Sequence, residues 1–225
     1  GLQNADNITA TYSTAATPAN PIGNYAIVAA MVDPGKKLTN YSVTLNSGTL
    51  TVTAAELTFK ANNLSRAYGQ ANPALTGVIT GLQNADNITA TYSTTATIAS
   101  PAGTYSIVPT LADPGKKLAN YSVNYVNGTM SVTPASLTVT ASNVSRRYGQ
   151  ANPSLTGVIT GLQSGDNITA IYSTTATASS PVGTYTIVPS LTDPANKLSN
   201  YTATLKNGVL TVAAAPLTIS AHNTS

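Results

Sequence analysis

The chain has 225 residues, of which only 8% are charged, and its net charge is +3. It contains no cysteine, so disulfides, thiol chemistry and cysteine-based metal sites are excluded. Its Lys and Arg residues are scattered, which argues against nucleic-acid binding, and no run approaches the roughly 18 apolar residues of a membrane-spanning helix.

A long block of sequence recurs along the chain. The decapeptide that begins at Gly1 returns at Gly81 and, slightly changed, at Gly161, so the period is 80 residues. A fixed period of this kind is typical of an array of similar modules. Because the chain opens in the middle of its own pattern, we expect it to be an excerpt from a longer protein.

The predicted elements are clearest in the second block. Residues 88–93 alternate apolar and polar side chains, and residues 105–108 do so again after a tight Pro101-Ala102-Gly103 turn. The next segment, 113–120, predicts one short helical turn, because Asp is a good N-cap and Pro suits the first helical position. Equivalent turns are expected at Asp33 to Thr39 and at Asp193 to Ser199.

Strand patterns continue through the rest of the block. Residues 121–125, 130–133 and 137–141 show a period of two with Thr, Val and Tyr, and residues 155–159 predict a further short strand. The pair Asn127-Gly128 predicts a type I′ hairpin turn, which needs positive φ at both residues. Its equivalents are Ser47-Gly48 and Asn207-Gly208.

Module limits follow from this order of strands. Short Pro/Ala linkers predict complete modules at 57–134 and 137–214, with 1–54 as the back part of an earlier module and 217–225 as the first strand of a further one. Linkers this short predict a semi-rigid connection. We therefore expect an all-β fold of small two-layer, sandwich-like modules joined head to tail, each with one short helical turn. The alternative is a β-grasp-like sheet packed on that helical turn.

One polar string is distinctive and occurs twice. It reads Arg-x-Tyr-Gly-Gln-x-Asn-Pro, and its fixed residues include Arg66, Tyr68, Gly69, Asn72 and Pro73, and again Arg146, Tyr148, Gly149, Asn152 and Pro153. A Gly-Leu-x-x-x-Asp loop, a Pro-x-Gly-Thr-Tyr turn and an Asn-Tyr segment ending in Asn-Gly follow in order. Together these motifs resemble the MBG repeat of the YGX type, and the resemblance covers essentially the whole chain.

The resemblance implies a small β-rich extracellular module that occurs in tandem in large bacterial surface and adhesin-like proteins. It supplies no established catalytic residues to carry over. From the residues themselves we expect the rings of Tyr68 and Tyr148 to cover the ends of their modules. The neighbouring arginine would stack on the ring or bond to backbone carbonyls.

The sequence offers no set of catalytic residues. His222 is the only histidine and has no counterpart one or two periods earlier, where Ser142 and Asn62 stand, so no Ser-His-Asp or Cys-His set is available. Asp86 and Asp113 recur once per block and would suit a paired-carboxylate site. Roles in turns and caps are the favoured interpretation of both.

Ligand and modification sites are weakly indicated. Asn84, Asp86 and Asn87 supply oxygen atoms, but one carboxylate is few for a calcium ion. Lys117 and Asn120 recur together, yet an internal isopeptide bond needs a buried lysine beside a protonated acid, so solvated lysines are favoured. Several Asn-x-Ser/Thr sequons stay open as glycan acceptors.

Tyrosine is the main aromatic residue, with 12 Tyr, one Phe and no Trp. Tyr92, Tyr105 and Tyr121 recur in the other blocks and occupy the inward phase of the predicted strands. We expect them to pack in the core rather than to stack on sugars.

These features predict a non-enzymatic structural repeat region of a large bacterial extracellular protein, located at the cell surface or secreted. It would act as a semi-rigid stalk or as the protomer of a surface fibre, with neighbouring modules and identical chains as partners. No cofactor, metal, nucleic acid or membrane insertion of this segment is expected. The alternative is an adhesin array that binds a glycan or a host-surface protein through avidity.

Overall fold

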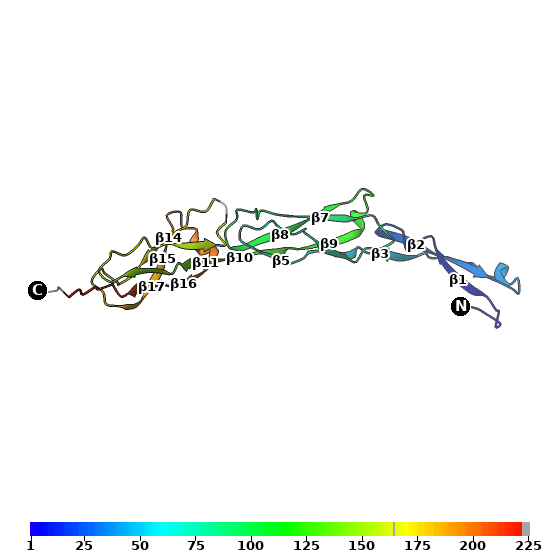
Figure 1. The fold of residues 1–225 in the computed structure, drawn as a ribbon. Helices are drawn as coiled ribbons and strands as arrows, with labels where there is room; N and C mark the ends of the chain where they lie inside the picture. Colours follow the sequence, from blue (N-terminus) through cyan, green and yellow to red (C-terminus); the bar gives the residue numbers. More distant parts are fainter. Residues whose placement is uncertain (164, 222–225) are drawn as a thin grey trace, which may run out of the picture. The chain divides into compact units, whose positions relative to one another are not determined.

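The computed structural model describes residues 1–163 and 165–221, and strands with their connecting loops make up nearly all of it (Figure 1). This confirms the predicted all-β fold of small modules. The chain divides into two compact units, Gly1–Asn62 with Leu75–Ser93 and Ile107–Gly128, and Asn63–Ala74 with Thr94–Ser106 and Thr129–Ser225. Because both units share the second block, the module limits stay a prediction.

The third block lies wholly in the second unit and shows how one repeat is built. Its three-stranded sheet has the order β13-β11-β16, and its four-stranded sheet has the order β12-β17-β15-β14. The strands are β11 (Ala135–Ala141), β12 (Val144–Arg147), β13 (Gly157–Thr160), β14 (Thr169–Ser173), β15 (Gly183–Thr192), β16 (Tyr201–Lys206) and β17 (Gly208–Ala213).

Strand β11 is the buried centre of the smaller sheet. It pairs antiparallel with β13 and parallel with β16, and Leu137 and Val139 on one face are 0% exposed. Its Thr residues alternate with these apolar side chains, which is the pattern of a pleated strand with one buried face. The apolar face of β11 meets β15 and β17 of the other sheet, where Ile187 and Leu210 are also fully buried. The repeat is therefore a two-layer β structure.

The other blocks repeat these pairings. In the first unit, β4 (Ala55–Ala61) pairs antiparallel with β6 (Gly77–Thr80) and parallel with β9 (Tyr121–Val126). In the second unit, β5 (Leu64–Ala67) pairs parallel with β10 (Gly128–Thr133), as β12 does with β17. The same block also contributes β7 (Thr89–Thr94) and β8 (Gly103–Ala112). Predicted strands at 88–93 and 121–125 thus lie within one residue of the observed ones.

The first block forms a single sheet in the order β1-β2-β3, with β1 (Thr9–Thr14), β2 (Gly23–Val32) and β3 (Gly48–Val52). Residues 41–46 correspond to β9 and β16 but form no strand. Residues 217–221, part of the segment predicted as a strand over 217–225, also form none, and 222–225 lie outside the described residues. Each segment lacks the pairing partner that its counterparts have within the same unit.

The helical turns are shorter than predicted. They are the three-residue 3-10 turns η1 (Leu38–Asn40), η2 (Leu118–Asn120) and η3 (Leu198–Asn200), which begin five residues after the aspartate of the Asp-Pro pair. The aspartate is therefore not the N-cap, although its carboxylate accepts hydrogen bonds from the turn, as Asp193 does from Leu198 N–H at 2.6 Å. This bond is the main cause that lowers the pKa of Asp193.

The predicted hairpins at Asn127-Gly128 and Asn207-Gly208 are wrong. Strands β16 and β17 belong to different sheets, so the chain crosses from one layer to the other at Asn207, and neither Asn207 nor Gly208 has positive φ. Glycine is needed there for another reason. A Cβ on Gly208 would lie 2.7 Å from the carbonyl oxygen of Ser142.

The prediction that the recurring tyrosines pack in the core is confirmed for some of them. Tyr121 and Tyr201 are 8% and 7% exposed, and Tyr92 and Tyr105 are half-buried. Tyr12, in the single sheet of the first block, is 73% exposed because no second layer covers it within its unit. No helix in the described part of the chain has the length and apolar character to cross a membrane.

The crossover glycine generates the first prediction. Gly208→Ala should destabilise the fold by about 1–3 kcal/mol, because the new methyl group overlaps the Ser142 and Ala141 carbonyl oxygens. The urea unfolding midpoint followed by circular dichroism measures this. The matched control is Gly115→Ala, whose Cβ meets nothing closer than the flexible Lys117 side chain at 3.5 Å. Equal midpoints for the two variants would contradict the steric explanation.

Candidate functional site

The two copies of the Arg-x-Tyr-Gly string each hold a buried arginine. Arg146 is 8% exposed, and its Nε donates to Asn152 Oδ1 at 2.7 Å while Nη1 donates to the Arg147 carbonyl at 3.2 Å. Nη2 donates to the Thr177 carbonyl. The guanidinium is therefore held by neutral oxygen acceptors in three directions, which suits its fixed fork of donors.

Arg66 repeats this arrangement one period earlier. It is also 8% exposed, and it donates to Asn72 Oδ1 and to the carbonyls of Ala67 and Thr97. We name this group, the arginine with its Asn and carbonyl acceptors, the arginine clamp. The bonds to carbonyls are those expected from the sequence; no stacking of these arginines on the tyrosines is seen among the described residues.

The other residues of the string shape the loop around the clamp. Asn152 Nδ2 donates to the Ala176 carbonyl at 2.6 Å while its Oδ1 accepts from Arg146 Nε, so the asparagine links the loop both to residue 176 and to the arginine. Gly149 adopts φ +81° and Gly69 φ +76°, in the left-handed region that glycine enters without strain. Pro73 and Pro153 are exposed. The clamp thus fixes a loop, and its polar atoms already bond one another.

The tyrosines of the two strings have different surroundings. Tyr68 is 5% exposed, its hydroxyl donates to Asp166 Oδ1 at 3.2 Å, and its ring meets Tyr201 edge to face at 5.5 Å. Tyr148 is 48% exposed. Tyr68 belongs to the second block and Asp166 to the third, so this contact joins adjacent blocks inside the second unit.

The Asp166 carboxylate accepts hydrogen bonds from the hydroxyl groups of two tyrosines. Besides Tyr68, it accepts the hydroxyl of Tyr201, which itself accepts the backbone N–H of Gln163 at 3.0 Å. Burial is the largest influence on Tyr201, and with the bond to the Asp166 carboxylate it raises the pKa of this phenol to about 12. The same Tyr–Asp pair occurs as Tyr121 with Asp86 and as Tyr41 with Asp6.

A second contact between blocks recurs in both units. Asn120 Oδ1 accepts the backbone N–H of Ile22 at 3.2 Å, and Asn200 Oδ1 accepts that of Ala102 at 2.8 Å. Both bonds join residues 98 positions apart in the sequence. We call this asparagine bond, together with the Tyr68–Asp166 contact of the second unit, the block junction.

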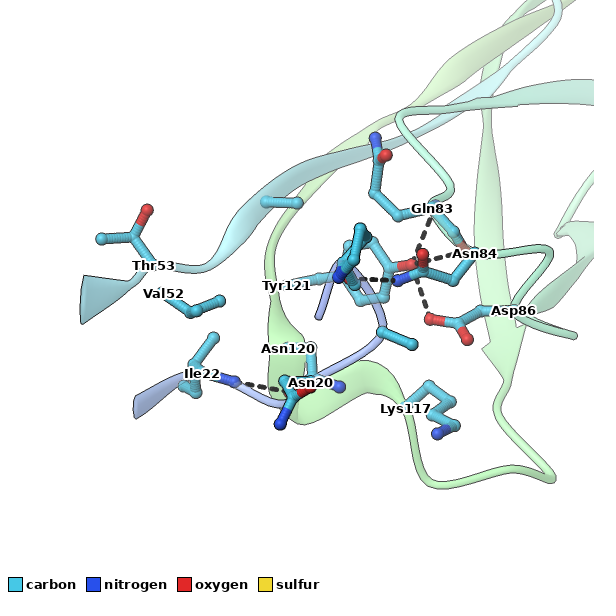
Figure 2. Close-up of a pocket in the computed structure, with 13 residues that line it drawn as sticks. Asn20, Ile22, Val52, Thr53, Gln83, Asn84, Asp86, Lys117, Asn120 and Tyr121 are labelled. Atoms are coloured by element: carbon cyan, nitrogen blue, oxygen red, sulfur yellow. Dashed lines mark hydrogen bonds between the residues drawn. The ribbon is translucent and has the colours of Figure 1, made fainter. Parts of the chain in front are cut away.

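A pocket in the first unit lies at its block junction (Figure 2). It has a volume of about 360 Å³ and is lined by polar side chains of both blocks, among them Asn20, Asn84, Asp86 and Lys117. Figure 2 shows the Tyr121 hydroxyl between Gln83 and Asp86, to which it is hydrogen-bonded. A pocket of about 320 Å³ in the second unit shares some of these positions, among them Gln163, Asp166 and Lys197, and there Tyr68 forms part of the wall.

The remaining candidates take structural positions. Asp113 accepts the backbone N–H groups of Lys117 and Leu118, and Asn84 Nδ2 donates to the Pro18 carbonyl. Within residues 1–163 and 165–221, no group of three acidic or histidine side chains is placed to hold a metal ion. His222 and Ser164 lie outside the described residues.

Sequence reasoning missed the block junction. Asn120 ends the segment predicted as a helical turn, and its backbone N–H bonds to Lys117, but its side chain reaches the previous block. The Asn-Tyr dipeptide occurs at the same place in all three blocks, at 40–41, 120–121 and 200–201. That recurrence indicates that the asparagine has a specific role, but it does not identify the residue to which its side chain bonds.

Comparison with known proteins agrees with this architecture. The family described as MBG domain (YGX type) matches residues 1–51, 57–131 and 137–211, so the chain belongs to this family and holds three tandem copies of its domain. A search of curated proteins finds no match.

The arginine clamp generates a prediction with a neighbouring control. Arg146→Lys should destabilise the protein by about 2–4 kcal/mol, because an ammonium group cannot reach three separate acceptors and leaves buried oxygens without donors. Arg147→Lys, on the same strand but exposed, should change stability by less than about 0.5 kcal/mol. Chemical denaturation of both variants checks this, and a similar loss at both positions would count against the clamp.

The tyrosine pair generates a pH prediction. The pKa of Tyr201 is raised from 10.0 to about 12 in the folded protein, so its stabilisation is complete below pH 10 and is lost as the pH rises toward 12. The urea midpoint should therefore fall over this range. Tyr201→Phe should weaken that fall and remove the last tyrosinate step seen at 295 nm, whereas Tyr148→Phe should keep both. Persistence of the late step in Tyr201→Phe would contradict the assignment.

Proposed function

We propose that these tandem MBG domains form a non-enzymatic structural region of a large bacterial extracellular protein, as a semi-rigid stalk or as the protomer of a surface fibre. The observation that carries the proposal is the block junction. The asparagine bond between adjacent blocks occurs twice with the same spacing, between Ile22 and Asn120 and between Ala102 and Asn200. An array that repeats its contacts between blocks resists bending at each of them.

The links between blocks support the same role. In the second unit a single residue, Pro134, separates β10 from β11, so the chain passes from one block to the next between two hydrogen-bonded strands. A linker of this kind has none of the reach of a flexible Gly/Ser tether. Tension applied along the chain is thereby passed directly to sheet hydrogen bonds.

The polar groups support a structural rather than a chemical role. Each arginine clamp, each Tyr–Asp pair and each Asp turn bonds to other groups of the chain. General acid–base and nucleophilic catalysis need groups aimed at a substrate and titrating near the working pH. The groups in these clusters are instead engaged in holding loops and junctions.

Adhesion is the second candidate, and the junction pocket of the first unit favours it. Its lining of Asn, Asp, Lys and Tyr side chains suits a small polar ligand such as a glycan. An array of such pockets would bind through avidity. A glycan array probed with the 225-residue chain separates the candidates: reproducible binding that is lost in Lys117→Ala favours adhesion.

Single-molecule stretching of the same chain tests the structural role. Each complete domain should unfold in one step that releases about 25 nm, the extended length of residues 57–131 or 137–211. Discrete steps are expected because each repeat is closed by hydrogen-bonded pairs of strands that lie far apart in the sequence. Smooth extension at low force, without such steps, would sink the proposal.

A further inference from the structure

The first strand and the last strand of a repeat each lie at the centre of a sheet. In the third block, β11 lies between β13 and β16, and β17 lies between β12 and β15. Both strands therefore have hydrogen-bonded neighbours along both sides. An edge strand is bonded along one side only, so it can be peeled away more easily than a central strand.

The two ends of the repeat also run side by side over their whole length. Ala135 pairs with Tyr201 at the start of β11, and Arg147 pairs with Ala213 at the end of β12. The offset is 66 residues at both points, since 201 − 135 = 66 and 213 − 147 = 66. These pairs are all parallel, although β11 and β12 belong to different sheets. We name the segments 135–147 and 201–213 the parallel ribbon.

A side-chain bond spans the point at which the parallel ribbon changes sheets. The registers of β11 with β16 and of β12 with β17 do not include residues 141–143. There, Asn143 Oδ1 accepts the backbone N–H of Val209 at 2.9 Å, again across 66 residues. The second block has the same bond, from Thr129 N–H to Asn63 Oδ1 at 2.9 Å. The asparagine thus continues the row of hydrogen bonds where the backbone pairing is interrupted.

The direction of the parallel ribbon decides how tension acts on it. Pro134 alone separates β10 from β11, so tension from the preceding block enters the ribbon at Ala135. Tension leaves a repeat through its last strand, which in the third block is β17 and ends at Ala213. Because Ala135 and Ala213 lie at opposite ends of the ribbon, its two segments are pulled past each other along their common axis. The bonds of a parallel pair are evenly spaced, so all of them are loaded together.

The arginine clamp holds the far end of the same ribbon. Arg146 lies on β12, and its guanidinium bonds to Asn152 and to the Thr177 carbonyl. Just beyond it, the Tyr148 N–H donates to the Ala213 carbonyl at 2.8 Å. Strand β12 is therefore fixed to loops from the middle of the repeat, which keeps it from sliding along with β17 when β17 is pulled.

We propose that the parallel ribbon is the force-bearing element of each repeat, loaded in shear by tension along the chain, and that the repeat stays folded until the ribbon breaks as a unit. This inference rests on the structural role proposed above and names the part of the repeat that performs it. The second block has the same offset, pairing Ala55 with Tyr121 in the first unit and Ala67 with Thr133 in the second. Because forced unfolding is governed by a rate, strength should depend on the direction of pulling as well as on stability.

Pulling the full 225-residue chain in two directions tests the inference, because the chain has no native cysteine and can be held at two introduced ones. Pro134→Cys with Ala214→Cys holds opposite ends of the ribbon and loads it in shear. Pro134→Cys with Ser199→Cys holds neighbouring ends, since Ala135 pairs with Tyr201, and peels β16 from β11 bond by bond. The substituted residues are exposed, so both variants should have the same urea midpoint. The shear pair should nevertheless unfold at a several-fold higher force.

The asparagine bond provides a matched comparison in the shear direction. Asn143→Ala, added to the shear pair, should unfold about two- to tenfold faster at a fixed force, because one hydrogen bond is lost from the loaded row. Ser145→Ala removes an exposed hydroxyl from β12 and leaves that row intact, so its unfolding rate should not change.

Two results would overturn the inference. One is an equal unfolding force in the two directions, and the other is an equal unfolding rate for Asn143→Ala and Ser145→Ala. In either case, discrete unfolding steps would still uphold the structural role. Smooth extension in both directions would contradict that role as well.

Discussion

The parallel pairing of strands that lie 66 residues apart is the constraint on which the rest of this structure depends. Ala135 pairs with Tyr201 in one sheet, and Val144 pairs with Leu210 in the other. Strands β11 and β12 open the block and β16 and β17 close it, so both sheets join the two ends of one repeat. A repeat is complete only when both ends are present, and the first block, which has only the later strands, leaves Leu50 exposed. Such non-local pairing predicts slow folding and a cooperative response to force.

Few charges contribute to this fold, and the most buried of them have neutral partners. Each clamp arginine bonds to an asparagine oxygen and to backbone carbonyls. A buried cation normally needs compensation, and here several oriented dipoles provide it. The arginine in turn satisfies carbonyls that would otherwise be buried without donors. This exchange explains a buried arginine in a chain with only 8% charged residues.

The sequence predicted the strands well and their partners poorly. Alternation of Leu137, Val139 and Ala141 with threonines determines which face is buried, and the period predicts an array. The type of pairing is not local information, however. Asn207-Gly208 has the composition of a hairpin turn, but β16 pairs with β11, and the glycine instead allows the chain to pass the Ser142 carbonyl. The Asp-Pro pair likewise has the composition of a helix start, but its carboxylate bonds to a turn five residues later.

The same difference between local patterns and distant partners applies to the candidate site. The repeated Arg-x-Tyr-Gly string marks a specific structure, in which the arginine bonds to the carbonyls of Arg147 and Thr177 and the glycine has a positive φ. The partners of the junction residues belong to another block, so no local pattern identifies them. Asn200 is 3% exposed because its amide oxygen reaches Ala102 of the preceding block. One kind of bond, a backbone amide donating to a side-chain oxygen, occurs both between repeats at Asn200 and inside a repeat at Asp193. Because each repeat has its own sheets and the links are as short as Pro134, the mechanical strength of an array is expected to be set by the sheets rather than by the links.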